Sequence, residues 1–144
     1  MNTSYTAQDF GAFGLRVAFG VLLLAHGLLK VMVFTVPGTV DFFASLGLPA
    51  VIAYLTIFGE IAGGIALIAG VYTRLTALLT VPIMLGATWA HLGNGWVFSS
   101  NGGGWEFPAL LGVIAGVVAL QGPGAFALKR LPVIDDFVPA ALKA

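Results

Sequence analysis

Six ionisable side chains stand inside or beside stretches of sequence that are otherwise almost entirely apolar. They are Arg16, His26, Lys30, Glu60, His91 and Glu106. Carboxylate, imidazole and ammonium groups can carry protons, pair as ions or bind a polar small molecule. Because an ionised group near the middle of a bilayer costs about 2.5–3.5 kcal/mol on insertion scales, such a residue within an apolar span is a candidate for function.

Glu60 is the most informative of the six. It lies near the centre of an apolar stretch, residues 51–71, and its short side chain is too far from either end to reach polar headgroups. A glutamate in hydrocarbon is either protonated or ionised beside a cation. Lys30 and a protonated His26 are the candidate partners, which predicts contact between residues far apart in the sequence.

The composition excludes several classes of protein. Of 144 residues, 59% are hydrophobic and 8% charged, and mean hydropathy is +1.03, whereas an ordinary soluble domain has about 45–50% apolar and about 25% charged residues. Six Lys and Arg balance six Asp and Glu without a basic run, so nucleic acid is not an expected partner. Cysteine is absent, which excludes disulfide and thiolate chemistry. A redox role would therefore need a bound cofactor or a quinone.

Four apolar stretches must position the ionisable groups, at residues 11–34, 51–71, 75–91 and 107–120. A helix needs about 20 apolar residues to cross a bilayer, and the third and fourth stretches are short by this measure. The pattern predicts an all-α protein: a single integral-membrane domain, built as a four-helix antiparallel bundle and surrounded by the lipid bilayer.

The cationic residues near the spans predict the orientation. The first span is longer than the core of a secretory signal, so we expect it to stay in the mature protein. The positive-inside rule places the loops rich in Lys and Arg in the cytoplasm, and so predicts that both termini are cytoplasmic. The cations used for this assignment are Arg16, Arg74, Lys129, Arg130 and Lys143.

Counting residues along the predicted helices places most of the polar groups at a similar depth in the membrane. At about 1.5 Å per residue, His26 and Lys30 lie about 4–5 Å and about 10 Å to the outer side of the first span's centre. His91 follows at the outer end of the third span and Glu106 at the outer start of the fourth. With Glu60, these residues predict a polar pocket open to the outer face. Arg16 lies toward the cytoplasm, where we expect it to extend into the headgroup region.

Other interpretations of these residues remain open. Glu60, His26 and Lys30 could form only a buried structural clamp. His91 could be an interfacial histidine, and Glu106 could complement the dipole of the fourth helix. Two histidines and two glutamates could in principle hold a metal, or the histidines a haem, but there is no Glu-x-x-His pair, and no metal is predicted. No catalytic triad, HExxH motif or phosphate-binding glycine loop is present.

The connections and small residues complete the predicted architecture. Residues 41–46 are expected to form a short amphipathic helix on the outer surface or a loop folded back into the bundle. The glycine-rich stretch 93–105, with its tryptophans, is expected to be a mobile outer loop. Small residues let membrane helices approach closely, and those at candidate contacts are Gly20, Gly27, Gly64, Gly112 and Gly116.

Several short motifs at fixed separations resemble the DoxX family of small bacterial membrane proteins. They are Arg16 followed by Gly20, His26-Gly-Leu-Leu-Lys30, Gly47-Leu-Pro49, Glu60-Ile-Ala-Gly63-Gly64, Gly70-Val-Tyr-Thr-Arg74 and His91. The similarity covers about residues 13–124. It implies a four-helix bundle in the bacterial inner membrane. It also implies a redox setting, since the family name comes from subunits of a thiosulfate:quinone oxidoreductase.

Taken together, these observations predict a quinone-linked redox subunit that binds a small molecule in the outer half of the bundle. Glu60 and His26 are the expected catalytic groups, passing protons. Substrate binding is expected from Lys30, His91, Glu106 and Arg16. No tightly bound cofactor is implied, and a quinone is the expected ligand. The alternative is a non-catalytic assembly subunit that docks on a larger oxidoreductase through Gly112 and Gly116. A homo-oligomer is a further open possibility. A permease is a third alternative.

Overall fold

The computed structural model describes residues 4–128 and 135–143, and within these residues the chain is all-helical, as predicted. Each predicted span corresponds to one helix, with ends that differ by at most four residues. A further helix, α2, and three short 3-10 helices lie between or after the spans. The helices are α1 (Ala7–Met32), α2 (Val36–Ser45), α3 (Ala50–Ala69), α4 (Thr73–His91), η1 (Leu92–Asn94), α5 (Glu106–Gln121), η2 (Asp135–Phe137) and η3 (Ala140–Leu142).

Three of these helices are long and apolar enough to cross a membrane: α1, α3 and α4 together with η1. Helix α5 is apolar but has 16 residues. At about 1.5 Å per residue it is about 24 Å long, slightly less than the roughly 30 Å thickness of the hydrocarbon core. The four-span topology and the cytoplasmic termini therefore stay predictions. Lys129 and Arg130, which contribute to that orientation, lie outside the described residues.

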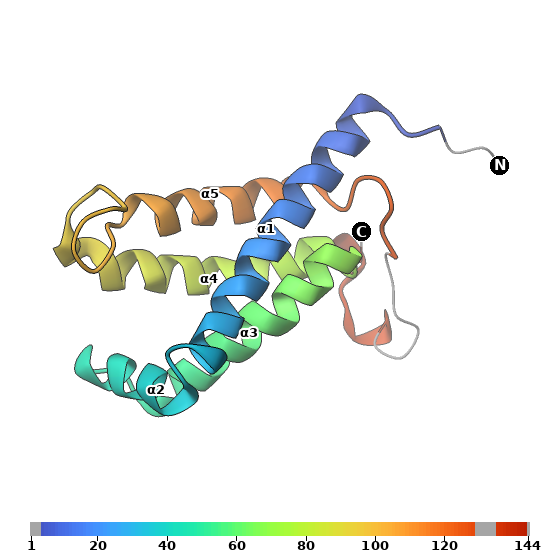
Figure 1. Cartoon of the computed structure of the whole chain (residues 1–144). Helices are drawn as coiled ribbons and strands as arrows, with labels where there is room; N and C mark the ends of the chain where they lie inside the picture. Colours follow the sequence, from blue (N-terminus) through green and yellow to red (C-terminus); the bar gives the residue numbers. More distant parts are fainter. Residues whose placement is uncertain (1–3, 129–134, 144) are drawn as a thin grey trace.

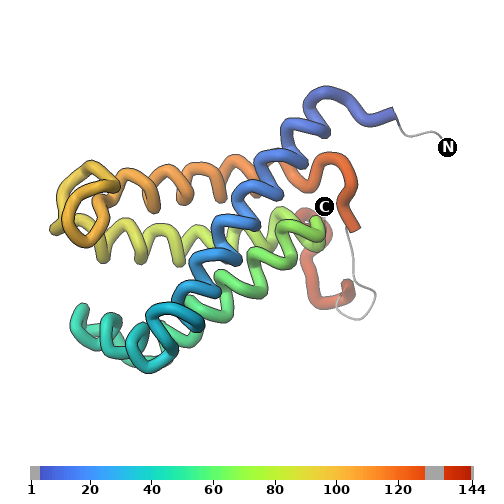
Figure 2. Tube along the Cα trace, viewed as in Figure 1, coloured from blue at the N-terminus to red at the C-terminus, as the bar shows by residue number. Residues whose placement is uncertain are grey.

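The helices form two pairs. Helix α1 packs along α3, and α4 packs along α5. The pairs cross at an angle, so they are close at one end and diverge toward the end that holds α2 and the loop before α5 (Figures 1 and 2). The start of α1 and the 3-10 helix η3 lie at the opposite end from α2 (Figure 1). A cluster of buried residues joins the pairs, made of Phe19, Leu23, Leu67, Ala77, Met84, Leu111, Ala115, Val118 and Ala119.

Glycines allow α1 and α3 to approach closely, as predicted for Gly20, Gly27 and Gly64. A Cβ atom added at Gly64 would lie 2.7 Å from the Leu24 backbone nitrogen and 2.8 Å from the Gly20 carbonyl oxygen. On α5, in contrast, a Cβ at Gly116 would meet nothing within 4 Å. The glycines of α1 and α3 therefore set the spacing of that pair, while Gly116 makes no close contact within the described chain.

Substituting Gly64 tests this close approach. We expect Gly64→Ala to lower the free energy of unfolding by about 2 kcal/mol, because overpacking a tight contact costs about 1–3 kcal/mol. The matched change Gly116→Ala should leave stability unchanged or raise it, since alanine favours helix over glycine by up to about 1 kcal/mol. Titration with SDS in mixed micelles measures both values. Equal stability of the two variants would contradict the packing described here.

Arg16 does not extend into the headgroup region, and that prediction is wrong. Its side chain is 0% exposed, and its guanidinium donates hydrogen bonds to four main-chain carbonyls. Two of these, Leu67 and Ile68, belong to the last turn of α3. The other two, Pro123 and Ala125, lie in the segment after α5. The last carbonyls of a helix lack partners within the helix, so Arg16 satisfies them and joins three parts of the chain.

Two connections have the predicted form. Helix α2 covers residues 41–45 of the predicted short helix, but it begins earlier, at Val36, and packs against α3 and α1. Its Thr39 hydroxyl donates to the Lys30 carbonyl at 3.1 Å. The turn between α3 and α4 joins them as antiparallel neighbours, as the predicted antiparallel bundle requires. It reverses through left-handed conformations at Gly70 (φ 72°) and Tyr72 (φ 42°), the first of which suits glycine because it lacks a Cβ.

Candidate functional site

A cavity of about 580 Å³ lies between the two helix pairs, beside the second halves of α1 and α4 and the start of α5. All four long helices and the loop before α5 contribute to its walls. Its polar lining consists of His26, Lys30, Glu60 and His91. The remaining walls are apolar or aromatic, from Leu22, Leu23, Met84, Ala87, Phe98, Gly103, Gly104, Phe107, Pro108 and Leu111. The cavity can therefore make a few hydrogen bonds, through side chains of both helix pairs, while most of its lining suits an apolar ring.

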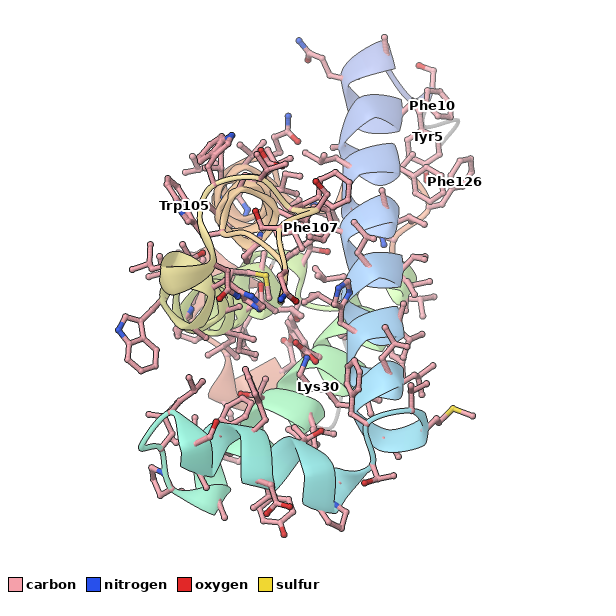
Figure 3. The ribbon with its side chains drawn as sticks, turned by 60° about the vertical axis from the view of Figure 1, so that its left-hand side comes forward. Tyr5, Phe10, Lys30, Trp105, Phe107 and Phe126 are labelled. Atoms are coloured by element: carbon pink, nitrogen blue, oxygen red, sulfur yellow. The ribbon has the colours of Figure 1, made fainter. Side chains whose placement is uncertain are left out.

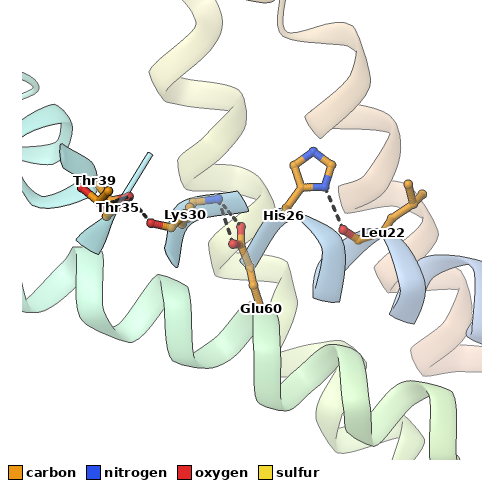
Figure 4. Close-up of polar contacts among 6 residues, drawn as sticks. All are labelled: Leu22, His26, Lys30, Thr35, Thr39 and Glu60. Atoms are coloured by element: carbon orange, nitrogen blue, oxygen red, sulfur yellow. Dashed lines mark hydrogen bonds and ion pairs between the residues drawn. The ribbon is translucent and has the colours of Figure 1, made fainter. Parts of the chain in front are cut away.

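Lys30 and Glu60 form an ion pair in this cavity, as predicted. The Lys30 Nζ atom lies 2.9 Å from Oε1 and 2.8 Å from Oε2 of Glu60 (Figure 4). The close packing of α1 on α3 places them together, since Gly27, one turn before Lys30, lies against Glu60. The side chains are 19% and 5% exposed, respectively. Lys30 points toward the space between the helix pairs (Figure 3), so the pair forms part of the cavity wall.

His26 is held in one tautomer by its own helix. Its Nδ1 atom lies 2.8 Å from the Leu22 carbonyl oxygen (Figure 4). A carbonyl can only accept a hydrogen bond, so Nδ1 carries the hydrogen and Nε2 of the neutral ring is left as an acceptor. The ring centroid lies 6.1 Å from that of Phe107. The imidazole is thus oriented by α1 and lies beside an aromatic side chain of α5.

His91, at the end of α4, is held in the same way by the following loop. Its Nδ1 atom lies 3.1 Å and 3.0 Å from the carbonyl oxygens of Gly102 and Gly103. The Asn94 side-chain amide donates to the same two oxygens, at 3.0 Å and 2.9 Å. The Asn94 amide nitrogen also lies 3.3 Å from Nδ1, but both of its hydrogens are taken by the two carbonyls. Because those carbonyls can only accept, Nδ1 donates to them, and Nε2 of the neutral ring is again an acceptor. The loop and the histidine fix each other's position at the cavity.

The structure does not place Glu106 or Arg16 in this cavity. Glu106 lines a second cavity of about 470 Å³ beside Trp96 and Trp105, and its Oε1 atom accepts a hydrogen bond of 2.8 Å from the Phe98 backbone nitrogen. Arg16 is bound to carbonyls near the opposite end of the bundle. Four of the six predicted site residues thus come together and two do not. For all six residues, the roles in binding and catalysis stay predictions.

The aromatic wall and the loop residues were not predicted from the sequence. Phe98 and Phe107 line both cavities, and Figure 3 shows Phe107 beside α1. The loop that carries Phe98 closes on itself through Trp105 N to Gly95 O and Glu106 N to Trp96 O, both 3.1 Å. The sequence signal for this loop conformation was Asn94, three residues after His91. A side-chain amide at that position can donate to the carbonyls of a loop that folds back over the helix end.

Comparison with known proteins identifies relatives of this chain. The DoxX family model matches residues 11–93. "Putative oxidoreductase CatD" of Bacillus subtilis (strain 168) is 36% identical over 87 residues, which cover 60% of this chain and 61% of that protein. "Inner membrane protein YqjF" of Escherichia coli (strain K12) is 29% identical over 126 residues, 86% of this chain and 93% of the relative.

"Inner membrane protein YphA" of the same Escherichia coli strain is 30% identical over 124 residues, 80% of this chain and 85% of the relative. No solved structure matches the chain significantly. The region matched by the family model contains all four polar residues of the cavity, while Glu106 and Phe107 lie beyond it. The match covers more than half of the chain, and the protein is therefore a multi-pass inner-membrane protein that belongs to the DoxX family.

Proposed function

We propose that this protein is a quinone-linked redox subunit of the inner membrane, and that it binds a quinone-type headgroup in the cavity between the helix pairs. The observation that carries the proposal is the cavity of about 580 Å³, whose lining combines four ionisable side chains with apolar and aromatic ones. Small-molecule sites are typically about 300–1,000 Å³ and mainly apolar, with a few placed polar groups.

The lining residues suit a flat ring that carries oxygen atoms. The Phe107 ring and the leucines offer apolar surface to the ring, while Lys30, Glu60 and the two imidazoles can contact its oxygens. Bound quinones supply two-electron chemistry coupled to protons. His26 and Glu60 are the groups placed to hold or pass protons at such oxygens.

The relatives support this proposal at the level of class. CatD carries the description "Putative oxidoreductase", and the other two relatives are described as inner membrane proteins. A lipid-soluble substrate suits a site enclosed by membrane helices, because it can enter from the bilayer. The cavity contains residues from all four long helices, so its shape depends on the whole bundle.

Equilibrium binding of a short-chain quinone to the protein in lipid nanodiscs tests the proposal. We expect saturable binding of the quinone and of its reduced form to the wild type, and for the reduced form a Kd at least about tenfold higher for Glu60→Gln, equivalent to about 1.4 kcal/mol, because one acceptor oxygen is replaced by a donor. Ala87→Phe, which fills the cavity without changing a charge, should also weaken binding. The control Asp41→Asn removes an exposed carboxylate of α2 that does not line this cavity, and it should leave the Kd unchanged.

Absence of saturable quinone binding to the folded wild type would contradict the proposal, as would equal weakening by Glu60→Gln and Asp41→Asn. The first result would favour the assembly-subunit alternative. Helix α5 is its docking candidate, because Val113 and Leu120 are 64% and 79% exposed and Gly116 has open space beside it. Co-purification of a membrane partner that depends on Gly116 would then identify that role.

A further inference from the structure

We infer that the cavity prefers the reduced, dihydroxy-aromatic form of its ligand to the oxidised quinone. This inference rests on the proposed function, since it assumes that a ring of this type enters the cavity. Its basis is the hydrogen-bonding character of the polar side chains, which the structure fixes through their contacts with the main chain and with one another.

Both imidazoles line the cavity, and each neutral ring keeps one nitrogen as an acceptor. His26 donates through Nδ1 to the Leu22 carbonyl, and His91 donates through Nδ1 to the loop carbonyls of Gly102 and Gly103. Each neutral ring has one hydrogen on nitrogen. The Nε2 atoms, on the other side of each ring, are therefore available only as acceptors (Figure 4 for His26).

The ion pair adds further acceptor capacity and little donor capacity. Both Glu60 oxygens accept from Lys30, and a carboxylate oxygen has lone pairs for more than one hydrogen bond. Of the three ammonium hydrogens of Lys30, two are directed at Glu60, which leaves one as a donor. The four polar side chains of the cavity thus offer acceptors on His26, His91 and Glu60, and a single donor on Lys30.

The oxidised and reduced forms of a quinone differ in whether they can donate hydrogen bonds. Quinone carbonyls can only accept hydrogen bonds, whereas the hydroxyls of the reduced form can donate them. Where a bound ring displaces water from the cavity lining, an acceptor that faces another acceptor loses its hydrogen bonds to water without replacement. Sites built to pair with a substrate hydroxyl discriminate strongly against an analogue that lacks it. Because acceptors outnumber donors among the polar side chains, the cavity favours the dihydroxy form over the quinone.

A metal ion would also use two free Nε2 atoms. Metal-binding histidines often donate their other nitrogen to a main-chain carbonyl, as both histidines do here. However, no group of three or more His, Asp or Glu residues suited to a metal occurs in the described part of the chain, and Glu60 is engaged by Lys30. The arrangement fits two hydroxyl groups better than a metal ion.

Three ligands that share one ring system test the inference: a naphthoquinone, its naphthalene-diol and the dimethyl ether of that diol. Their affinities for the wild-type protein are measured anaerobically in nanodiscs at neutral pH. We expect the diol to bind at least about tenfold more tightly than the quinone. The dimethyl ether, which cannot donate a hydrogen bond, should bind no more tightly than the quinone.

Variants assign the preference to the histidines. His26→Phe and His91→Phe each keep a ring but remove an acceptor, so each should lower the ratio of diol to quinone affinity several-fold. Asp41→Asn, an exposed position on α2 outside the cavity, should leave the ratio unchanged. If one histidine variant fails to fold, the other and the wild-type ligand series still decide the outcome.

The outcomes separate this inference from the proposed function. Equal affinities for diol and quinone, or tighter binding of the quinone, would overturn the inference while leaving the proposed function in place. A dimethyl ether that binds as tightly as the diol would overturn it as well, because hydrogen-bond donation would then play no role. Failure of all three ligands to bind would overturn both.

Discussion

Arg16→Met should lower the free energy of unfolding by about 4 kcal/mol or more, the largest effect expected for a single substitution in this protein. Hydrogen bonds to a charged group contribute about 1.5–3 kcal/mol each, and buried acceptors left without partners add a cost of their own. Arg16 serves four carbonyls and is 0% exposed. Titration of the purified protein with SDS in mixed micelles measures the loss.

Two further variants separate hydrogen bonding from charge. Arg16→Lys keeps the charge, but an ammonium has only three donors and cannot satisfy four carbonyls, so an intermediate loss is expected. Arg74→Met removes a guanidinium that makes no hydrogen bond among the described residues, and it should cost about 1 kcal/mol or less. A loss from Arg16→Met no larger than that from Arg74→Met would show that Arg16 does not join the helix ends as described.

The Lys30 and Glu60 pair is expected to give the second-largest effect. Removing one partner of a buried pair leaves an uncompensated charge, which costs about 3–5 kcal/mol. The partial exposure of Lys30, 19%, places Lys30→Met and Glu60→Met near the lower end of that range. The double variant should recover most of the loss, because replacing a buried pair by apolar side chains is often close to neutral.

The pattern of the three stabilities decides whether the residues are coupled. A double variant that is more stable than either single variant supports a direct ion pair in an apolar setting. Losses that simply add in the double variant would contradict it, since contacting residues show interaction energies of about 0.5–3 kcal/mol. The same SDS titration supplies all three values.

The helices were predictable because their signal is local. Apolar stretches and their bounding glycines and prolines lie in continuous sequence, so α1, α3, α4 and α5 end within four residues of prediction. The pairing of Lys30 with Glu60 was also accessible, because a buried carboxylate requires a cation and the register of α1 offered one at the right depth. Depth counting likewise placed His91 at the level of the cavity.

The predictions of where Arg16 and Glu106 lie were wrong because the contacts of these residues come from segments that fold back against them. Nothing near Arg16 in the sequence indicates that the segment after α5 crosses back to it, with Ala125 N bonded to Asp9 O at 3.0 Å. Glu106 was predicted to lie in the pocket from its depth alone. The turn of the preceding loop instead presents the Phe98 backbone nitrogen to its carboxylate. Depth along a helix does not determine such loop contacts.

The central claim is that the Lys30 and Glu60 pair forms part of a ligand site and is more than a structural clamp. The double variant Lys30→Met/Glu60→Met provides the most direct measurement, since it removes both charges while the bundle is expected to stay folded. Its affinity for the naphthalene-diol and the naphthoquinone is measured in nanodiscs after the SDS titration has established its stability. The account predicts a folded protein with at least about tenfold weaker binding of both ligands. Wild-type affinity in the folded double variant would contradict it and leave the pair with a structural role alone.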